Sequence, residues 1–316
     1  MQLNSYQNWY QNYTMKQTFP INICYLLATL IVMLLTSGCW FFPDNRDDTA
    51  EQELTTAETT VATHPPAPGH TSETIIFEEP NPPHSEEVET VPSPPVDDRP
   101  RIAIIIDDMG YHRKIGEKLL ALDLNLSFSF LPHAPFAGQQ EEKAFQMGRD
   151  VMVHLPMEAS DSKWNPGPGA LYLSASSDDL KLTLKKNLAA VPHAIGANNH
   201  MGSRFTQNRQ AMHTVLGELK NQGLFFVDSF TTARSTGMDE ARKMGIKTGR
   251  RHIFLDNEQN PQKICVQLNK LTALAEKQHQ AIGIGHPYQA TLDALRNCGE
   301  QLHKTVQVVP VHELVQ

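Results

Sequence analysis

Short apolar runs alternate with amphipathic stretches from about residue 101 to the C-terminus. The apolar runs predict strands over 102–107, 126–132, 150–157, 194–200, 224–229, part of 246–256, 281–286 and 306–311. Apolar residues at helical spacing predict helices over 112–122, 138–147, 177–190, 207–221, 238–243, 261–279 and 289–302. About seven strand–helix units in roughly 215 residues indicate an α/β fold with a parallel sheet. A closed or nearly closed (β/α) barrel is the economical arrangement, and a doubly wound open sheet is the alternative.

An almost wholly apolar stretch occupies residues 20–36, which is long enough to cross a bilayer or to form the core of an export signal. If translation starts at Met15, the segment resembles a bacterial export signal. "LLTSGC" then resembles a lipoprotein processing site with Cys39 as the lipidated residue, although Thr36 stands where Leu is preferred. An uncleaved anchor and ordinary cleavage are the alternatives. We expect 1–39 to be a signal or anchor segment that places the rest in the periplasm or cell envelope, tethered to the membrane.

Residues 40–98 are rich in Pro, Glu and Thr, and they contain fourteen acidic residues but a single basic one. Such a segment cannot bury enough apolar surface to offset its chain entropy, so we expect a disordered acidic linker. The remaining 99–316 forms the predicted domain. Its charge is only mildly basic, and no basic stripe with interleaved aromatic residues is present, so nucleic acid is not an expected partner.

The predicted domain contains two cysteines, Cys265 and Cys298. They can pair in an oxidising compartment, but their spacing is equally compatible with two separate buried thiols. No GxGxxG or GxxxxGK[ST] motif follows the first predicted strand, which disfavours a nucleotide-binding site.

Polar and titratable residues end one predicted strand after another. Since functional residues of parallel α/β folds collect at the carboxyl ends of strands, we take these as candidates for a site: Asp107, Asp108, His154, Glu158, His200, Arg204, Asp228 and His286. Carboxylate and imidazole ligands suit Zn²⁺ or a similar divalent ion. One Asp of the pair can hold the metal while its neighbour acts as a base, and a His across the site can protonate a leaving group.

Five motifs carry a family resemblance: "IIIDDMG", "VHLPME", "GANNHMGSRFT", "FFVDSFT" and "IGIGHPY". In this order, over 101–316, they resemble the divergent polysaccharide deacetylase branch of the polysaccharide deacetylase (NodB-homology) superfamily. The resemblance implies a distorted, often incomplete, (β/α) barrel, here of about seven strands by the count of units.

The resemblance also implies residue roles. Asp107 matches the catalytic base, Asp108 the metal-binding Asp and His154 the first His of an HxxxH metal motif. Position 158 is Glu instead of the second His, so the third ligand is open between Glu158 and His200. We favour His200, because it ends a strand and supplies an imidazole.

Three further roles are expected. Arg204 lies near the place of the arginine that orients the base, and His286 matches the general acid. Asp228 is expected either to bind or orient substrate or to act as a structural acceptor.

The implied activity is hydrolysis of an N- or O-acetyl group on a carbohydrate polymer of the cell envelope, by attack of a metal-bound water, with Zn²⁺ as the expected ion. One alternative is a catalytically degenerate module on a membrane tether that binds glycan or an envelope protein. Another is amide or peptide hydrolysis at the same site.

Overall fold

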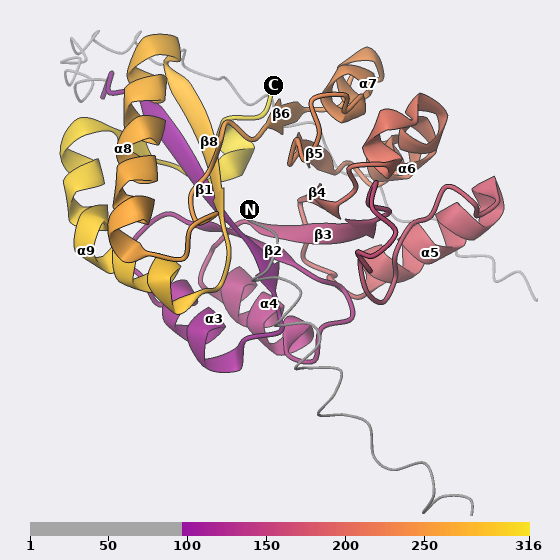
Figure 1. The fold of residues 1–316 in the computed structure, drawn as a ribbon, viewed down its shortest axis with the longest axis horizontal. Coiled ribbons are helices and arrows are strands. Elements are labelled where there is room, and N and C mark those ends of the chain that lie inside the picture. Colours follow the sequence, from indigo (N-terminus) through magenta and orange to yellow (C-terminus); the bar gives the residue numbers. More distant parts are fainter. Residues whose placement is uncertain (1–96) are drawn as a thin grey trace, which may run out of the picture. The chain divides into compact units, whose positions relative to one another are not determined.

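Parallel strands form one curved sheet in the computed structural model, which describes residues 97–316 (Figure 1). The predictions for the signal or anchor segment and for nearly all of the linker lie outside the described residues. Along the sheet the order is β6-β5-β4-β3-β2-β1-β8-β7, and β9 also pairs with β1. The strands are β1 (Arg101–Met109), β2 (Ser127–Phe130), β3 (Val151–Met157), β4 (Gly196–Met201), β5 (Phe225–Asp228), β6 (Thr248–Arg250), β7 (Ile253–Phe254), β8 (Gln280–Gly285) and β9 (Gln307–Val308).

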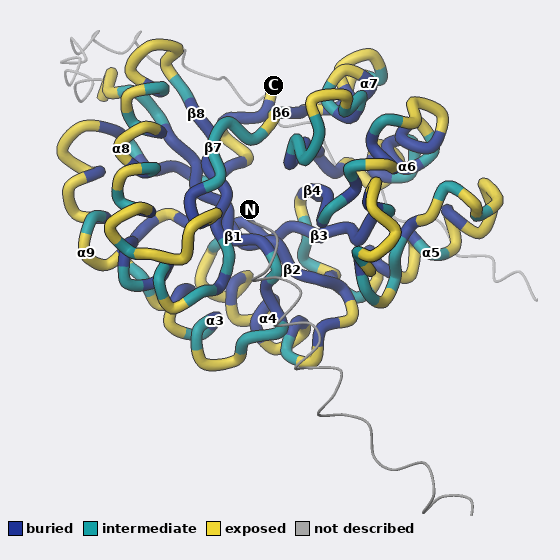
Figure 2. Tube along the Cα trace, in the orientation of Figure 1, coloured by how far each residue is buried: buried dark blue, intermediate teal, exposed yellow. Residues whose placement is uncertain are grey.

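Helices line the outer side of the curved sheet (Figure 1). Their outward faces are exposed and the strands between them are buried (Figure 2). The helices are α3 (Arg113–Leu120), α4 (Ala137–Gln146), α5 (Ser177–Ala189), α6 (Arg209–Asn221), α7 (Gly237–Lys243), α8 (Pro261–Gln278) and α9 (Gln289–Thr305). Short 3₁₀ turns cover Phe205–Gln207 and Val311–Glu313.

Side-chain caps explain where three of these helices begin. Ser176, Asn208 and Asn260 each accept a hydrogen bond from the backbone N–H three residues later, at the starts of α5, α6 and α8. Such a cap satisfies an N–H group that has no partner within the helix. In α8 a proline also occupies the first turn, where its missing N–H costs nothing.

The alternation of side chains along β1 divides the core in two. Ile102, Ile104 and Ile106 belong to the large cluster between the sheet and the helices. Ala103 and Ile105 belong to a smaller cluster on the inner side of the curve. Because successive strand residues point to opposite faces, a side chain in step with Ala103 and Ile105 faces the inside of the curve.

The inner cluster is completed by residues from the C-terminal end of the chain, namely Val309, Val311, Leu314 and Val315. The backbones of Thr248 and Gln316 exchange two hydrogen bonds, and the side chain of Gln280 donates to the carbonyl of Leu314. The C-terminal segment therefore bonds to β6 and to β8, on either side of the opening between the edge strands β6 and β7.

These observations confirm the expected α/β fold and its incomplete barrel. The edge strands β6 and β7 do not pair with each other, so the sheet is a curled half-barrel. The doubly wound alternative is wrong, since the helices lie on the outer side and the C-terminal segment fills the inner one. Each predicted strand region contains an observed strand, and the stretch 246–256 contains two short ones.

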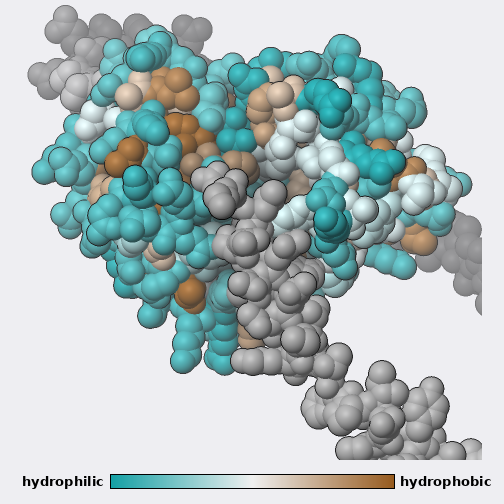
Figure 3. Space-filling view, viewed as in Figure 1, coloured by the Kyte–Doolittle hydropathy of each residue, from teal (hydrophilic) through white to brown (hydrophobic). Residues whose placement is uncertain are grey.

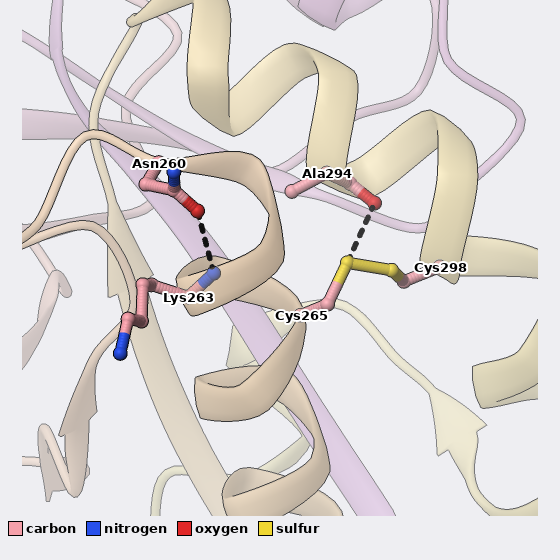
Figure 4. The surroundings of a disulfide bond; sticks show 5 residues. All are labelled: Asn260, Lys263, Cys265, Ala294 and Cys298. Atoms are coloured by element: carbon pink, nitrogen blue, oxygen red, sulfur yellow. Dashed lines mark hydrogen bonds between the residues drawn. A yellow bond between two sulfur atoms is a disulfide. The ribbon is translucent and has the colours of Figure 1, made fainter.

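Cys265 of α8 and Cys298 of α9 form a disulfide bond (Figure 4). This decides between the two states that the spacing left open. The bond links two neighbouring helices on the outside of the half-barrel (Figure 1).

The molecular face shown in Figure 3 is mainly hydrophilic, with hydrophobic side chains in separate small patches. Within residues 97–316, no helix combines the length and the apolar character that crossing a membrane requires.

Candidate active site

A bulge in β1 turns two adjacent carboxylates toward the same region. Ile106 pairs with Phe128, but Met109 pairs with Phe130, so β1 has one extra residue between these pairs. Asp108, within the bulge, has a left-handed backbone with φ of 54°. In a regular strand the side chains of Asp107 and Asp108 would point to opposite faces. Bulges re-aim side chains in this way, so both carboxylates reach the inner side.

Asp108, His154 and His200 bring three ligand atoms into a small triangle. Oδ1 of Asp108 lies 2.8 Å from Nδ1 of His200 and 3.2 Å from Nε2 of His154. The two ring nitrogens are 3.2 Å apart. His154 and His200 follow the inward alternation of β3 and β4, in which residue 154 pairs with 198 and residue 156 with 200. Strands far apart in sequence therefore converge on one point.

The triangle has the dimensions of a divalent metal site. Ligand atoms about 2.0–2.1 Å from one zinc ion, at angles near 90–110°, are separated by about 2.9–3.4 Å. Oδ1 of Asp108 is also buried and has no partner in hydrogen-bond geometry among the described residues, despite its two close nitrogen neighbours. A buried carboxylate oxygen without a partner is costly unless a cation occupies the place in front of it. The residues present thus fit a divalent ion.

The two carboxylates of β1 differ in electrostatic environment. Burial raises the pKa of Asp107 above its usual range. Burial acts on Asp108 in the same direction, but the imidazoles of His200 and His154 outweigh it and hold the pKa of Asp108 well below its usual range. Asp108 is therefore the carboxylate that stays charged, which suits a metal ligand, and Asp107 is the one better suited to accept a proton.

His286 follows β8 and pairs with a buried carboxylate. Its Nδ1 lies 2.8 Å from Oδ1 of Asp256, and its backbone N–H donates to Oδ2 of the same residue. Thr291 also donates to Asp256. Although burial alone lowers the pKa of His286, attraction to Asp256, with smaller contributions from the two β1 carboxylates, raises it to about 9. The ring is therefore protonated near neutral pH and can act as an acid.

The chain matches the family model for divergent polysaccharide deacetylase over residues 104–315. It belongs to the divergent polysaccharide deacetylase family. Two curated relatives support this assignment. The uncharacterized protein YibQ of Escherichia coli (strain K12) is 35% identical over 68% of this chain and 67% of its own length. An uncharacterized protein of Haemophilus influenzae is 34% identical over 68% of this chain and 76% of its own length.

A solved structure supports the fold of this family member. An uncharacterized protein of Agrobacterium tumefaciens C58 superposes with a TM-score of 0.66 at 23% identity, covering 69% of this chain and 89% of the other.

Two of the predicted site residues, Arg204 and Glu158, pair with each other instead of joining the carboxylates of β1. Arg204 Nη1 lies 3.4 Å from Glu158 Oε1, and Glu158 also accepts a hydrogen bond from the backbone of Leu173. Glu158 follows the last residue of β3, where the chain turns into a loop bonded to Leu171. The structure therefore brings His200, and not Glu158, to the other two predicted ligands.

Arg204, the residue expected to orient Asp107, pairs with Glu158 and not with Asp107. Its side chain is 58% exposed, and no ion pair between it and Asp107 occurs among the described residues. Sequence reasoning missed Arg251, an arginine on which the charge of Asp107 acts.

Arg251 donates to the backbone carbonyls of Ser229 and Phe230, and its guanidinium carbon lies 3.6 Å from the centroid of the Phe254 ring. Burial lowers the pKa of Arg251 to about 10, against the attraction of Asp107 and Asp228. It remains charged at neutral pH. The only indication of a functional role in the sequence is that Arg251 lies between the short strands β6 and β7, and this does not distinguish it from its neighbours.

Asp228 acts as a structural acceptor. It ends β5 in step with Phe226, which belongs to the outer cluster, so its side chain faces the helices. It accepts hydrogen bonds from Ser235 Oγ and from the backbone N–H groups of Phe230 and Met238. This carboxylate orders the segment between β5 and α7, which agrees with the second of the two roles that the sequence left open.

Asp256 is the other residue that sequence reasoning missed. The apolar run before it, "IFL", is short and contains the two-residue strand β7. An acidic residue directly after an apolar run is the same signal that marks Asp107. It could have been applied to Asp256.

Non-glycine residues with left-handed backbones lie at three strand ends around these groups. They are Asp108, Met201 with φ of 53° and Phe230 with φ of 47°. Such conformations cost energy for residues that have a side chain, and they concentrate at functional sites. Asp108 is itself a predicted ligand, Met201 follows His200, and the carbonyl of Phe230 accepts a hydrogen bond from Arg251.

Proposed function

We propose that this domain is a metal-dependent hydrolase that removes acetyl groups from carbohydrate of the cell envelope. The observation that carries the proposal is the buried triangle of Asp108, His154 and His200 beside a second buried carboxylate, Asp107. Membership of the divergent polysaccharide deacetylase family supports the acetylated carbohydrate as the substrate class. Zn²⁺ is the ion that we expect, since one carboxylate and two imidazoles are ligands that it accepts.

Asp108, His154 and His200 would hold a divalent ion, which would supply an activated water and polarise the acyl carbonyl. Asp107 accepts the proton of the attacking water, and its raised pKa makes it a stronger base than an exposed carboxylate. His286, protonated near neutral pH, donates a proton to the departing amine or alcohol. Asp256 orients the ring of His286 through its contact with Nδ1, which leaves Nε2 as the atom that donates.

An aromatic ring lies beside the proposed acid. The ring centroids of Tyr288 and His286 are 5.7 Å apart. Aromatic side chains offer a flat apolar face with a polar tip, which suits packing against a sugar ring. This placement supports a carbohydrate at the site.

We further propose that the domain acts outside the cytoplasm, tethered by the N-terminal segment. The disulfide between Cys265 and Cys298 supports an oxidising compartment, because such bonds are rare in reducing ones. The apolar stretch 20–36 supports an anchor or export signal.

The activity can be tested by acetate release from N-acetylated chitooligosaccharides and from O-acetylated xylan, with the zinc-supplemented protein. We expect release from at least one substrate, reduced about 10²–10⁴-fold in Asp107→Asn, which keeps the shape but not the basicity. Glu117→Gln, a change at a partly exposed side chain on α3, is the control and should be unaffected.

Amide or peptide hydrolysis is tested by the same preparation on peptide substrates. A protein that binds glycan but neither holds zinc nor releases acetate would contradict the proposed activity. It would favour the degenerate binding module.

A further inference from the structure

Asn198 connects the proposed base to a proposed metal ligand. This β4 residue is fully buried. Its Nδ2 donates to Oδ1 of Asp107 at 2.7 Å. Its Oδ1 lies 2.7 Å from Nδ1 of His154 and accepts from the hydroxyl of Ser129 at 2.6 Å. One amide therefore contacts three polar side chains from three other strands.

The contacts fix the orientation of the amide. When it is ionised, the Asp107 carboxylate accepts hydrogen bonds but cannot donate one. The NH₂ end of Asn198 must therefore face it. The opposite orientation would place two acceptor oxygens against each other. Oδ1 therefore faces Ser129 and His154, and Ser129 can rotate its hydroxyl to donate.

The amide in turn fixes the proton on His154. Since Oδ1 of Asn198 can only accept, Nδ1 of His154 must carry a hydrogen. In the neutral ring the lone pair is then on Nε2. That nitrogen is the atom that lies 3.2 Å from Oδ1 of Asp108 and 3.2 Å from Nδ1 of His200. The amide thus holds the ring with Nε2 facing the triangle, which is the atom that a metal there requires.

The fold makes this link through the curvature of the sheet. Asn198 pairs with His154 on the adjacent strand, so those two side chains lie next to each other. Asp107 is on β1, separated from β4 by β3 and β2 in the sheet order. A side chain on β4 reaches it across the inside of the half-barrel.

We propose that Asn198 is a positioning residue that sets the tautomer of His154 and the orientation of Asp107 at once. This inference rests on the proposed function, in which Asp107 is the base and His154 a metal ligand. Partners of this kind, behind a ligand, raise metal affinity by about 10–100-fold. Because the same amide holds the base, its loss lowers acetate release beyond the loss of zinc.

The matched control is Asn187, which is equally buried but outside the triangle. Its amide bonds the carbonyl of Gly169 and lies 2.9 Å from Nε2 of His133. A substitution there removes a buried amide of the same kind without touching the proposed ligands. Asn198→Leu and Asn187→Leu are therefore compared in the full chain.

The first measurement is zinc affinity, by competition with a chromophoric chelator. We expect Asn198→Leu to bind zinc about 10–100-fold more weakly than wild type, and Asn187→Leu to match wild type although it is less stable. Equal zinc affinity in Asn198→Leu and wild type would overturn the positioning role. If the leucine variant does not fold, Asn198→Ser is used, since one short hydroxyl cannot serve both Asp107 and His154, and the same loss is expected.

The second measurement needs no variant and no zinc. Long-range ¹H–¹⁵N spectra of metal-free wild type with ¹⁵N-labelled histidine, at a pH where His154 is neutral, should show its proton on Nδ1. A proton on Nε2 would overturn the inference. Zinc affinity of wild type separates the two proposals: failure to bind zinc with the proton on Nδ1 counts against the proposed function but supports the positioning role.

Discussion

At the scale of single residues, the environment assigns different tasks to chemically identical groups. Asp107 and Asp108 are adjacent, but burial raises the pKa of one while two imidazoles lower that of the other. Adjacent carboxylates would repel each other in a buried strand, and the bulge and the neighbouring imidazoles resolve this conflict. His286 differs from an ordinary histidine for the same kind of reason, because Asp256 raises its pKa to about 9.

The Asp256→Asn substitution should lower the pKa of His286 from about 9 to its ordinary value or below. The negative partner is removed while the burial that disfavours the charged ring remains. In the proposed reaction, acetate release should then decline at a lower pH than in wild type, because the acid loses its proton earlier. The pKa is measured from the Cε1 proton of His286 in an NMR titration.

Asp150→Asn is the control, since Asp150 makes a similar contact with His312, 2.8 Å from Nδ1. It should leave the pKa of His286 unchanged. The raised pKa also means that protonation of His286 stabilises the folded state fully below about pH 6.5, and that this contribution disappears as the pH rises through about 9. A wild-type His286 that titrates near 6.5 would contradict the role of Asp256.

At the scale of secondary structure, the disulfide should stabilise the pair of helices α8 and α9. Cys265 and Cys298 are 33 residues apart in sequence. Closing a loop of that size reduces the entropy of the unfolded chain and stabilises the fold by on the order of 3–4 kcal/mol. Urea unfolding of the oxidised protein and of the Cys265→Ala/Cys298→Ala variant measures the difference. Equal midpoints for the two would show that the bond does not constrain the unfolded chain.

The helices and strands themselves were largely predictable from local patterns. Apolar runs located each strand, and Asn260–Pro261 correctly predicted the start of α8. The stretch 246–256 was harder, because its two short strands lie at opposite edges of the sheet. A run of apolar residues does not reveal which partner each half will find.

At the scale of the whole molecule, the candidate site depends on the order of the strands. Strand ends alone were enough to nominate Asp107, Asp108, His154, His200 and His286. They did not reveal that Asp228 faces the helices, or that Arg251, in the link between the edge strands β6 and β7, donates to the carbonyls that follow β5. Those positions follow from tertiary packing, which one sequence does not express.

The resemblance located Arg204 by its place in a motif, but the structure pairs it with Glu158. Both residues lie just beyond strand ends, where loops set side-chain direction and alternation no longer applies. Glu158 therefore points away from the triangle and pairs with Arg204, and His200 lies beside Asp108 and His154 instead.

The proposed function requires that Asp108, His154 and His200 hold one divalent ion. Diffraction from crystals grown with one equivalent of Zn²⁺, collected above and below the zinc absorption edge, tests it most directly. We expect a single anomalous peak about 2.0–2.2 Å from a carboxylate oxygen of Asp108, Nε2 of His154 and Nδ1 of His200. A zinc-free triangle, or a peak ligated by Glu158, would contradict it.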